Sequence, residues 1–445
     1  MCGILCLISK NDIDLNSFLI MLHKLQHRGQ YSFGYSYLNN NKLYTENIRG
    51  LIKNHNINNI NIKSNLFIGH TRYITSGSKT NDVTQPVLCR MSKFGEFAFV
   101  FNGNITISTQ EYDVDTLYIK DYFLKADSNK YSSFEAILIA FMKECDRSYS
   151  MIVYHNDCVY LLRDRYGVRP LMYMFNSECI IIGSESIGVE KSKEVYTDVK
   201  AGEIIRIKDF KLESIYAFEG KTNVGNCLFE YIYFMNKNTT WNSINVEEVR
   251  GKYGEKLAQI ENEECILNNK KDYIVVGIPK SGIPSAKSYA STQGIEYKQF
   301  ITKNKNINRT FILDTEAERK NIANQKYIFD DEIKNSRLII FDDSIVRGIT
   351  METLVKSLKE FGALEVHVRI ASPQIKYTCG YGIDIPTRNE LLMNKYDSIE
   401  NVVNYLGCDS LTFLDLDNLS SCMSNFNTLC TACLLYTSNA ADKGE

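Results

Sequence analysis

The chain opens with Met1-Cys2-Gly3-Ile4-Leu5-Cys6-Leu7-Ile8, and this stretch decides the fold of its first half. The apolar run after Gly3 is too short for a membrane span or for the core of a signal peptide, and its length predicts a buried strand. Cys2 is small, so we expect an aminopeptidase to remove Met1 and to leave Cys2 with both a thiol and a free α-amine. Such an amine, with a pKa of about 7.7–8.0, can serve as the base for its own nucleophile. Alone, the tripeptide is more typical of a small buried cysteine, so the interpretation depends on segments downstream.

Composition narrows the class of protein. A chain of 445 residues can form two or three domains, and a net charge of −2 provides no basic surface for nucleic acid or an anionic membrane. No apolar stretch is long enough to span a bilayer, so we expect a soluble cytoplasmic protein without a membrane partner. The 13 cysteines are an odd number in a long chain, which disfavours a secreted disulfide framework and leaves thiols for metal binding.

Three downstream segments complement the start of the chain: His27-Arg28-Gly29-Gln30, Gly69-His70-Thr71-Arg72-Tyr73 and Phe101-Asn102-Gly103-Asn104. With Cys2 they resemble the glutaminase domain of the N-terminal-nucleophile amidotransferases. The resemblance implies a four-layer αββα sandwich over residues 2–222, in which the Cys2 thiolate attacks the side-chain amide of glutamine. It also implies that the Asn102 side chain and the backbone N–H of Gly103 stabilise the oxyanion, where one lost donor typically costs about 2.7–4 kcal/mol.

The same resemblance implies that Arg72 and Asp115 bind the α-carboxylate and α-ammonium groups of glutamine. The planar fork of arginine suits a carboxylate, and the aspartate suits an ammonium group. A further segment, residues 163–171, resembles another part of this family, and we interpret it as structural.

Apolar spacing predicts the regular elements of this half. A helix is expected over residues 16–26, capped by Asn16 or Ser17, with further helices after Asp115 and over 134–143. Strands are expected at 66–70, 97–101, 149–155, 158–163, 171–175 and 179–183.

The pattern changes after a polar, glycine-containing boundary at residues 218–224. Buried strands are expected at 273–277, 338–341 and 366–370, with a helix over 350–361 that stops at Gly362. Strand–loop–helix units of this kind form a parallel sheet, with ligands at the carboxyl ends of its strands.

One of these strands runs into Ile339-Ile340-Phe341-Asp342-Asp343-Ser344-Ile345-Val346-Arg347-Gly348-Ile349-Thr350. This string resembles the phosphoribosyl-pyrophosphate (PRPP) loop of the glutamine PRPP amidotransferases, and the resemblance extends from Cys2 to about Cys433. It implies an α/β type I phosphoribosyltransferase domain over residues 227–433. Asp342 and Asp343 are expected to hold the ribose hydroxyls and, with Ser281, Mg²⁺, a cation that prefers oxygen ligands. The loop's backbone N–H groups are expected to cradle the 5′-phosphate at a helix N-terminus, and the residues concerned are Ser344, Ile345, Val346, Arg347, Gly348 and Thr350.

Two more segments resemble parts of this PRPP site. Gly277-Ile278-Pro279-Lys280-Ser281-Gly282 resembles the pyrophosphate loop, so Lys280, Ser281 and Gly282 are expected to bind PRPP, although the family has Asp where Lys280 stands. Residues 303–326 resemble the flexible loop that closes over PRPP, and we predict that this loop orders only when PRPP and Mg²⁺ bind.

Four cysteines form a candidate metal site. Cys430 and Cys433 make a CxxC pair, and Cys227 and Cys379 stand where one branch of the family has thiolate ligands. Four thiolates suit a structural [4Fe–4S] cluster, which the resemblance favours, and zinc would accept the same ligands. Residues 434–445 do not resemble the family and are interpreted as a non-family tail.

The implied activity transfers the amide nitrogen of glutamine to PRPP and gives 5-phosphoribosylamine, glutamate and pyrophosphate, the first committed step of purine synthesis. The resemblance also implies a homotetramer that purine nucleotides inhibit. The alternative is a divergent paralogue that binds PRPP or nucleotides as a regulator. The substitutions at Lys280 and at Ile349, where the family has Thr, would allow it.

Overall fold

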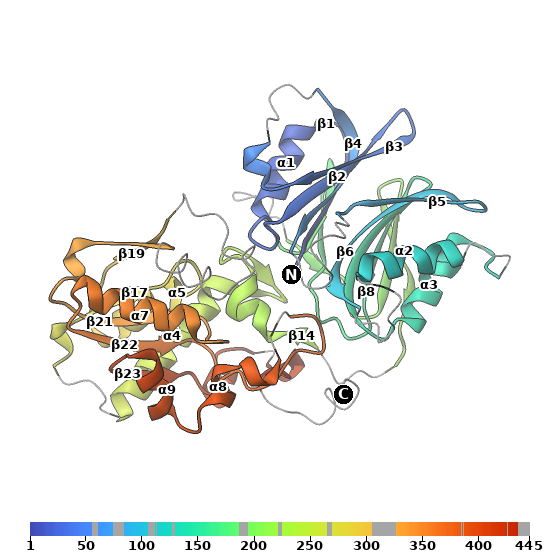
Figure 1. Ribbon diagram of the computed structural model, residues 1–445. Coiled ribbons are helices and arrows are strands. Elements are labelled where there is room, and N and C mark those ends of the chain that lie inside the picture. Colours follow the sequence, from blue (N-terminus) through green and yellow to red (C-terminus); the bar gives the residue numbers. More distant parts are fainter. Residues whose placement is uncertain are drawn as a thin grey trace.

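A computed structural model describes residues 1–55, 61–73, 84–105, 112, 114–126, 130–186, 195–220, 225–264, 269–304, 326–383, 385, 387–424 and 426–434. Its two halves lie side by side, with the blue-to-green first half on one side and the yellow-to-red second half on the other (Figure 1). The N-terminus lies where the halves meet, so the first strand begins beside the second half of the molecule.

Seven strands form the first sheet of the N-terminal half, in the order β11-β9-β10-β1-β4-β2-β3. The central strand β1 pairs antiparallel with both β10 and β4, which fixes Cys2 beside the end of β4. The strands are β1 (Gly3–Asp14), β2 (Ser32–Asn39), β3 (Lys42–Arg49), β4 (Lys63–Arg72), β9 (Met172–Phe175), β10 (Cys179–Gly183) and β11 (Thr197–Asp198).

Six antiparallel strands form the second sheet, in the order β13-β12-β8-β7-β6-β5. They are β5 (Val87–Met91), β6 (Gly95–Asn104), β7 (Ser148–His155), β8 (Cys158–Arg163), β12 (Glu203–Lys208) and β13 (Lys211–Ala217). Strand β6 carries Asn102 and Gly103 at its end, which is how the sheet delivers them to the edge where β1 begins.

The alternation of side chains along β1 builds the layers. Ile4 and Cys6 join the core between the two sheets, whereas Leu5 and Leu7 pack against helix α1 (Leu15–Lys24) on the outer face. Helices α2 (Asp115–Lys125) and α3 (Phe134–Glu144) cover the outer face of the second sheet. The order helix, sheet, sheet, helix is the αββα sandwich expected from the sequence.

A five-stranded parallel sheet organises the C-terminal half, in the order β18-β17-β21-β22-β23. Helices α4 and α5 pack on one face, and α7 and α9 pack on the other. The bounds are β17 (Tyr273–Gly277), β18 (Glu296–Tyr297), β21 (Arg337–Asp342), β22 (Glu365–Ile370), β23 (Ser410–Phe413), α4 (Val246–Glu264), α5 (Ile283–Gln293), α7 (Ile349–Phe361) and α9 (Ile399–Leu406).

Short elements complete this half. Two of them matter for the sites: η2 (Glu230–Phe234), a single π-helical turn, and the parallel pair β14 (Asn226–Cys227) with β24 (Leu429–Cys430). The remainder are β15 (Thr240–Trp241), β16 (Ile244–Asn245), β19 (Ile301–Lys303), β20 (Tyr327–Phe329), α8 (Leu392–Lys395), α10 (Leu416–Ser420) and the 3₁₀ turns η1 (Ile52–Asn54), η3 (Lys270–Asp272), η4 (Asp331–Ile333), η5 (Arg388–Glu390) and η6 (Phe426–Thr428).

The ends of two helices test the expectations from the sequence. Helix α1 is capped by Asp14, whose carboxylate accepts the N–H of Ser17 at 2.9 Å, so the expected cap at Asn16 or Ser17 is wrong. A carboxylate three residues ahead of that N–H is a strong N-cap, and it competes successfully with Ser17 itself. Helix α7 does stop at Gly362, whose φ of 112° is a conformation that side chains other than glycine's rarely adopt.

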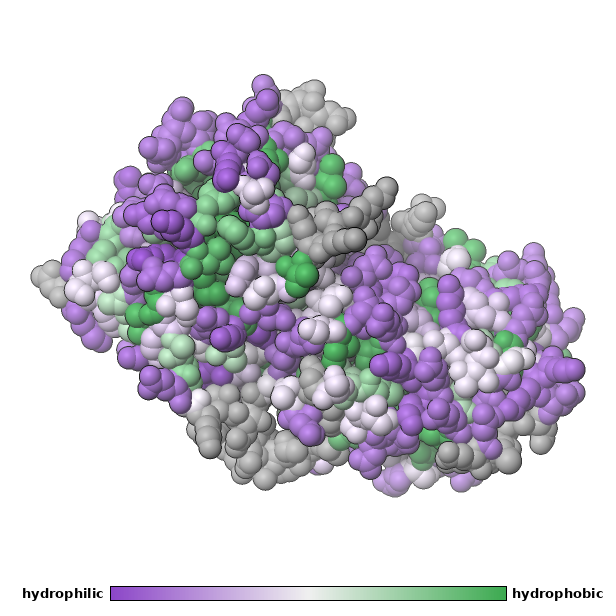
Figure 2. Space-filling model, turned by 180° about the vertical axis from the view of Figure 1, so that it is seen from behind, coloured by the Kyte–Doolittle hydropathy of each residue, from purple (hydrophilic) through white to green (hydrophobic). Residues whose placement is uncertain are grey.

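The surface is polar over most of the face shown in Figure 2, with hydrophobic residues gathered only in small patches. In the part of the chain that the structure describes, every helix is too short or too polar to cross a membrane.

Candidate active site

Cys2 lies at the start of β1, at the junction of both sheets. Its thiol is close to the backbone of Tyr73, with the Tyr73 N–H 3.5 Å and the Tyr73 carbonyl 3.6 Å from Sγ. Gly3 and Gly29 permit this close packing, because a Cβ on Gly3 would lie 2.7 Å from Thr71 Oγ1, and one on Gly29 would lie 2.4 Å from the Thr71 carbonyl. The thiol is therefore held against the end of β4 by backbone that only glycine allows.

Asn102 meets Cys2 directly. Its Oδ1 accepts a hydrogen bond from the Cys2 nitrogen at 3.0 Å, and that nitrogen becomes the α-amine once Met1 is removed. Asn102 Nδ2 is buried and has no hydrogen-bond partner among the described residues. A buried amide donor without an acceptor costs free energy, so Nδ2 is available for an oxyanion that forms beside the thiol.

Arg72 and Asp115 line one small cavity with Cys2 and Gly103. Asp115 Oδ2 accepts the N–H of Ile105 at 2.9 Å, and both charged side chains are more than nine-tenths buried. The described side chains leave a volume of about 30 Å³ beside the thiol. The structure thus brings together the five residues that the sequence assigned to glutamine.

A buried ion-pair network links this cavity to the second half of the chain. The Arg28 guanidinium donates to Glu185 at 2.6 Å and to Glu230 at 2.8 and 3.0 Å, while its Nε donates to the Cys2 carbonyl at 3.1 Å. Glu185 also accepts from the Asn236 N–H and the Thr239 hydroxyl. Burial raises the pKa of Glu185, but the charges of His27 and Arg28 outweigh it and hold that pKa below 4.5.

Sequence reasoning gave no role to this network. Arg28 lies in a segment that resembles the family, whereas Glu185 and Glu230 were assigned to no motif. A charged residue within an apolar stretch, as Glu230 is in Phe229-Glu230-Tyr231-Ile232, is the signal that could have pointed to a buried partner.

Asp342 is the last residue of strand β21, and Asp343 follows it directly. The Ser281 hydroxyl hydrogen-bonds to Asp343, as does the Ser344 hydroxyl at 2.6 Å. Burial and the neighbouring charge of Asp343 raise the pKa of Asp342 well above its ordinary value. Two carboxylates confined this closely fit a hard cation, which would relieve their repulsion.

The loop after these carboxylates leads into α7 at Ile349, and Gly348 turns it with a φ of 85°. Ile345 packs its side chain into the core and the Val346 carbonyl accepts from Leu392, so these residues can offer a phosphate only their N–H groups. The Arg347 side chain pairs with Glu390 at 3.0 Å.

Lys280, Ser281 and Gly282 form the turn between β17 and α5, beside the end of β21. A Cβ on Gly282 would lie 2.3 Å from the Phe341 carbonyl, so this turn touches the strand that carries Asp342. Lys280 is exposed at its rim. Residues 305–325, most of the loop expected to close over PRPP, lie outside the described residues, and only Lys303, Asn304 and Lys326 can be placed.

Tyr233 is electrostatically coupled to both sites. The pKa of its phenol is raised by desolvation and then by the charges of Asp343, Tyr73 and Asp342, although 47% of the residue is exposed. It belongs to the same π-helical turn as Glu230, which joins the network around Arg28.

The four expected cysteine ligands gather near the C-terminal strand. Cys227 and Cys430 are direct partners in the β14–β24 pair, and Cys379 Sγ accepts two backbone N–H groups at 3.4 Å. Burial, followed by the charges of Cys379, Cys227 and Cys430, raises the pKa of the Cys433 thiol. The cysteines are therefore neighbours, although no three His, Cys, Asp or Glu side chains in the described part of the chain are arranged around one metal ion.

Both candidate metals accept this donor set. Zinc can take four thiolates at one ion, and a [4Fe–4S] cluster takes one thiolate at each iron.

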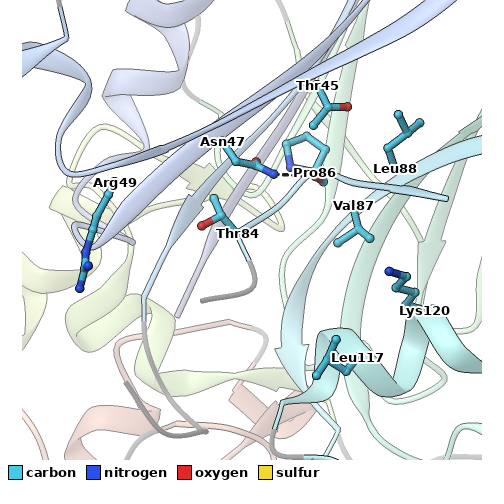
Figure 3. A pocket seen from close by; sticks show the side chains of 9 residues that line it. All are labelled: Thr45, Asn47, Arg49, Thr84, Pro86, Val87, Leu88, Leu117 and Lys120. Carbon is cyan, nitrogen blue, oxygen red and sulfur yellow. Dashed lines mark hydrogen bonds between the residues drawn. The ribbon is translucent and has the colours of Figure 1, made fainter. Parts of the chain in front are cut away.

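A larger cavity of about 650 Å³ lies elsewhere, between β3, β5 and α2. Figure 3 shows Arg49 on one side and Lys120 on the other, with Thr45, Thr84 and Asn47 between them. Its described lining has no thiol, carboxylate or imidazole, and its charged groups are the cations Arg49 and Lys120.

Comparisons with known proteins agree with this architecture. A family model described as a glutamine amidotransferase domain matches residues 70–190, and one described as a phosphoribosyl transferase domain matches residues 241–373. The amidophosphoribosyltransferase of Methanothermobacter thermautotrophicus is 31% identical over 437 residues, covering 93% of this chain and 88% of its own. That of Pyrococcus horikoshii is 34% identical over 449 residues, covering 97% of this chain and 95% of its own.

A solved structure matches over the whole fold. The glutamine PRPP amidotransferase from B. subtilis, complexed with ADP and GMP, has a TM-score of 0.82 at 28% identity, covering 98% of this chain and 97% of that one. Fold and site together define a glutamine-dependent amidotransferase with a phosphoribosyltransferase domain. The chain belongs to the amidophosphoribosyltransferase family, whose members carry out the first step of purine biosynthesis. This confirms the fold class and the enzyme activity expected from the sequence, and it disfavours the regulator.

Proposed function

We propose that this chain hydrolyses glutamine at Cys2 and uses the ammonia to convert PRPP to 5-phosphoribosylamine at Asp342 and Asp343. The observation that carries the proposal is the buried Arg28–Glu230 ion pair, which joins the carbonyl of the nucleophile to the domain that holds the carboxylates. A glutaminase acting alone would not need its nucleophile fixed to a second site.

In the first step, the Cys2 thiolate attacks the side-chain carbon of glutamine. The thiol proton goes to the α-amine freed by loss of Met1, and Asn102 Nδ2 with the Gly103 N–H stabilises the oxyanion. The amine returns the proton to the leaving nitrogen, ammonia departs, and water hydrolyses the thioester to glutamate. Arg72 binds the α-carboxylate and Asp115 the α-ammonium of glutamine. The free α-amine of Cys2 is tested by measuring the intact mass of the protein, which should be lower by one methionine residue than the mass of the full sequence.

In the second step, the lone pair of ammonia attacks C1 of PRPP, the bond to pyrophosphate breaks, and the amine loses one proton. Asp342 and Asp343 hold the ribose hydroxyls, and the N–H groups of residues 344–350 bind the 5′-phosphate. The turn at Lys280, Ser281 and Gly282 binds the pyrophosphate.

Mg²⁺ would be held by Asp342 and Asp343, with the Ser281 hydroxyl beside them, and would neutralise the pyrophosphate as it leaves. Mg²⁺ is usually bound by one or two carboxylates plus substrate phosphates, so a site with only two carboxylates is complete once PRPP is present.

The [4Fe–4S] cluster is proposed at Cys227, Cys379, Cys430 and Cys433, where it would fasten the C-terminal strand to β14. The adjacency of these thiols supports it. Anaerobically prepared protein should contain about four irons per chain, and iron-free protein of full activity would contradict it.

Several broader properties are proposed with this function. We place the domain limits at 2–222 and 227–433, followed by a tail at 434–445. The free thiols of the described cysteines fit a reducing cytoplasm. A homotetramer inhibited by purine nucleotides is proposed from the B. subtilis relative, whose structure contains ADP and GMP. Sedimentation measures the oligomeric state. Adding increasing concentrations of ADP and GMP while pyrophosphate release is measured tests the inhibition.

The experiment that tests the function supplies glutamine labelled with ¹⁵N in its side-chain amide, together with PRPP and Mg²⁺. The phosphoribosylamine product is trapped and its ¹⁵N content is measured in the presence of added unlabelled ammonia. A ¹⁵N content that the unlabelled ammonia does not dilute supports transfer inside the protein. Glutamate release without labelled product would contradict the proposal.

A further inference from the structure

Arg169 is a buried charge without a counter-ion among the described residues. Its side chain is fully buried, and Nη2 donates to the Tyr381 carbonyl at 2.5 Å. In the described part of the chain, Nε and Nη1 donate to nothing. A guanidinium cannot lose its proton in a protein, so these two N–H groups belong to a full positive charge inside the molecule.

The neighbouring carboxylates are already engaged. Asp164 accepts the N–H groups of Tyr149, Tyr166 and Gly167, and Glu230 is bound to Arg28. No ion pair joins Arg169 to any described carboxylate. An uncompensated buried charge costs several kcal/mol, so the fold needs a negative partner at this position.

Two neighbours of Arg169 connect it to segments that carry the cysteines. The residue before it, Val168, accepts the N–H of Cys227 at 3.1 Å. On the other side, Tyr381 and Gly382 follow Cys379, and a Cβ on Gly382 would lie 3.1 Å from Arg169 Nη2. The guanidinium therefore lies between the segments that carry Cys227 and Cys379.

We infer that Arg169 is the buried counter-charge of the cysteine set, and that its two free N–H groups face the thiolates when these ligate a [4Fe–4S] cluster. The inference rests on the cluster proposed above. Four thiolates outweigh the positive charge of the iron–sulfide core, so the ligated cluster is an anion. A fixed cation beside it favours cluster retention and favours the more negative, reduced state over the oxidised state.

This gives Arg169 a role that the glutaminase domain does not need for its own chemistry. Arg169 belongs to the segment 163–171 that was interpreted as structural from the sequence, in which Arg163 donates to three backbone carbonyls. Arg169 differs from Arg163 because only one of its donors reaches a carbonyl.

The test compares Arg169→Gln and Arg169→Lys with Arg250→Gln, the control, which removes a buried arginine that donates to the Tyr231 and Met235 carbonyls away from the cysteines. Anaerobic protein is assayed for iron content, for the rate of iron loss to a chelator and for the midpoint potential of the cluster. Glutamine hydrolysis reports whether each variant folds.

We expect Arg169→Gln to lose iron about tenfold faster than wild type and to have a more negative potential. Arg169→Lys, which keeps the charge, should retain most of the wild-type potential, and Arg250→Gln should leave it unchanged. If Arg169→Gln does not fold, the potential of Arg169→Lys decides. If Arg169→Lys has the midpoint potential of wild type, the result supports Arg169 as the counter-charge. If its potential becomes more negative, as expected for a neutral residue, the result contradicts it.

Two results would overturn the inference in different ways. Arg169→Gln with the iron retention and potential of wild type would show that Arg169 only supports the Tyr381 carbonyl. Wild-type protein without iron would remove the cluster and the counter-charge together, while leaving glutamine-dependent transfer untouched.

Discussion

Arg28 and Glu230 form a two-pronged ion pair across the two halves of the molecule, with both side chains fully buried. Arg28 also donates to the Cys2 carbonyl, so one guanidinium contacts the nucleophile's own residue and the transferase domain. Breaking a buried pair by removing one partner is strongly destabilising. We therefore expect this ion pair to hold the Cys2 segment in a fixed position relative to the transferase domain.

We predict that Glu230→Gln lowers the free energy of unfolding by about 3–5 kcal/mol and lets ammonia escape, so that glutamate exceeds pyrophosphate in the products. The matched control is Glu261→Gln, which breaks the buried pair with Arg369 inside the transferase domain alone. It should cost similar stability while the two products stay equal. Equal products in Glu230→Gln would contradict the link.

Asn102→Asp isolates the oxyanion donor. The variant keeps an oxygen for the Cys2 nitrogen, whereas the unpartnered Nδ2 is replaced by a second oxygen. We expect kcat for glutamine hydrolysis to fall by about 10²–10³ with little change in KM, because the lost contact exists only in the transition state. Steady-state kinetics measure this, and activity within twofold of wild type would show that Nδ2 is not the donor.

Glu185 predicts how stability depends on pH. The pKa of its carboxyl is held below 4.5 in the folded protein by His27 and Arg28, against the effect of burial. The ionised Glu185 carboxylate therefore contributes fully to the free energy of unfolding at pH values above 4.5, its ordinary pKa. This contribution is lost as the pH falls below that value. Urea unfolding should show the wild type losing up to about 1.4 kcal/mol per pH unit more than Glu185→Gln in that acid range. Parallel pH profiles would exclude Glu185 as the cause.

Much of this fold could be predicted from apolar spacing alone. The strands expected at 149–155, 158–163 and 366–370 differ by at most one residue from β7, β8 and β22. The hairpin of β2 and β3 and the long helix α4 were not expected, because β2 is buried almost throughout and α4 is strongly polar, so neither shows a clear period.

The residues of the candidate site also divide into those that could be predicted from the sequence and those that could not. Residues within local motifs, such as Asn102 and Asp343, could be found because strand ends and tight turns fix them relative to their neighbours. The Arg28–Glu230 pair could not, because its partners are 202 residues apart and only the docking of the two halves brings them together. Contacts of this kind depend on tertiary structure, which spacing along the chain does not encode.

Asp343→Asn tests the transferase site. It removes one of two confined carboxylates, and with it the charge that helps raise the pKa of Asp342. Losing a charged contact of about 1.5–3 kcal/mol should lower kcat/KM for PRPP by roughly 10- to 150-fold. The exposed Asp331→Asn, remote from the strand end, is the control. An unchanged kcat/KM for PRPP in Asp343→Asn would exclude this carboxylate from PRPP binding.

The most direct test of the whole account compares wild type with Cys2→Ala, using Cys179→Ala on strand β10 as the thiol control. With PRPP and Mg²⁺ present, wild type and the control should release glutamate and pyrophosphate in equal amounts from glutamine. Cys2→Ala should release neither from glutamine, yet should still release pyrophosphate when ammonia is supplied, because the second site has its own contacts. Glutamate release by Cys2→Ala, or failure of wild type to release pyrophosphate with glutamine, would contradict the account.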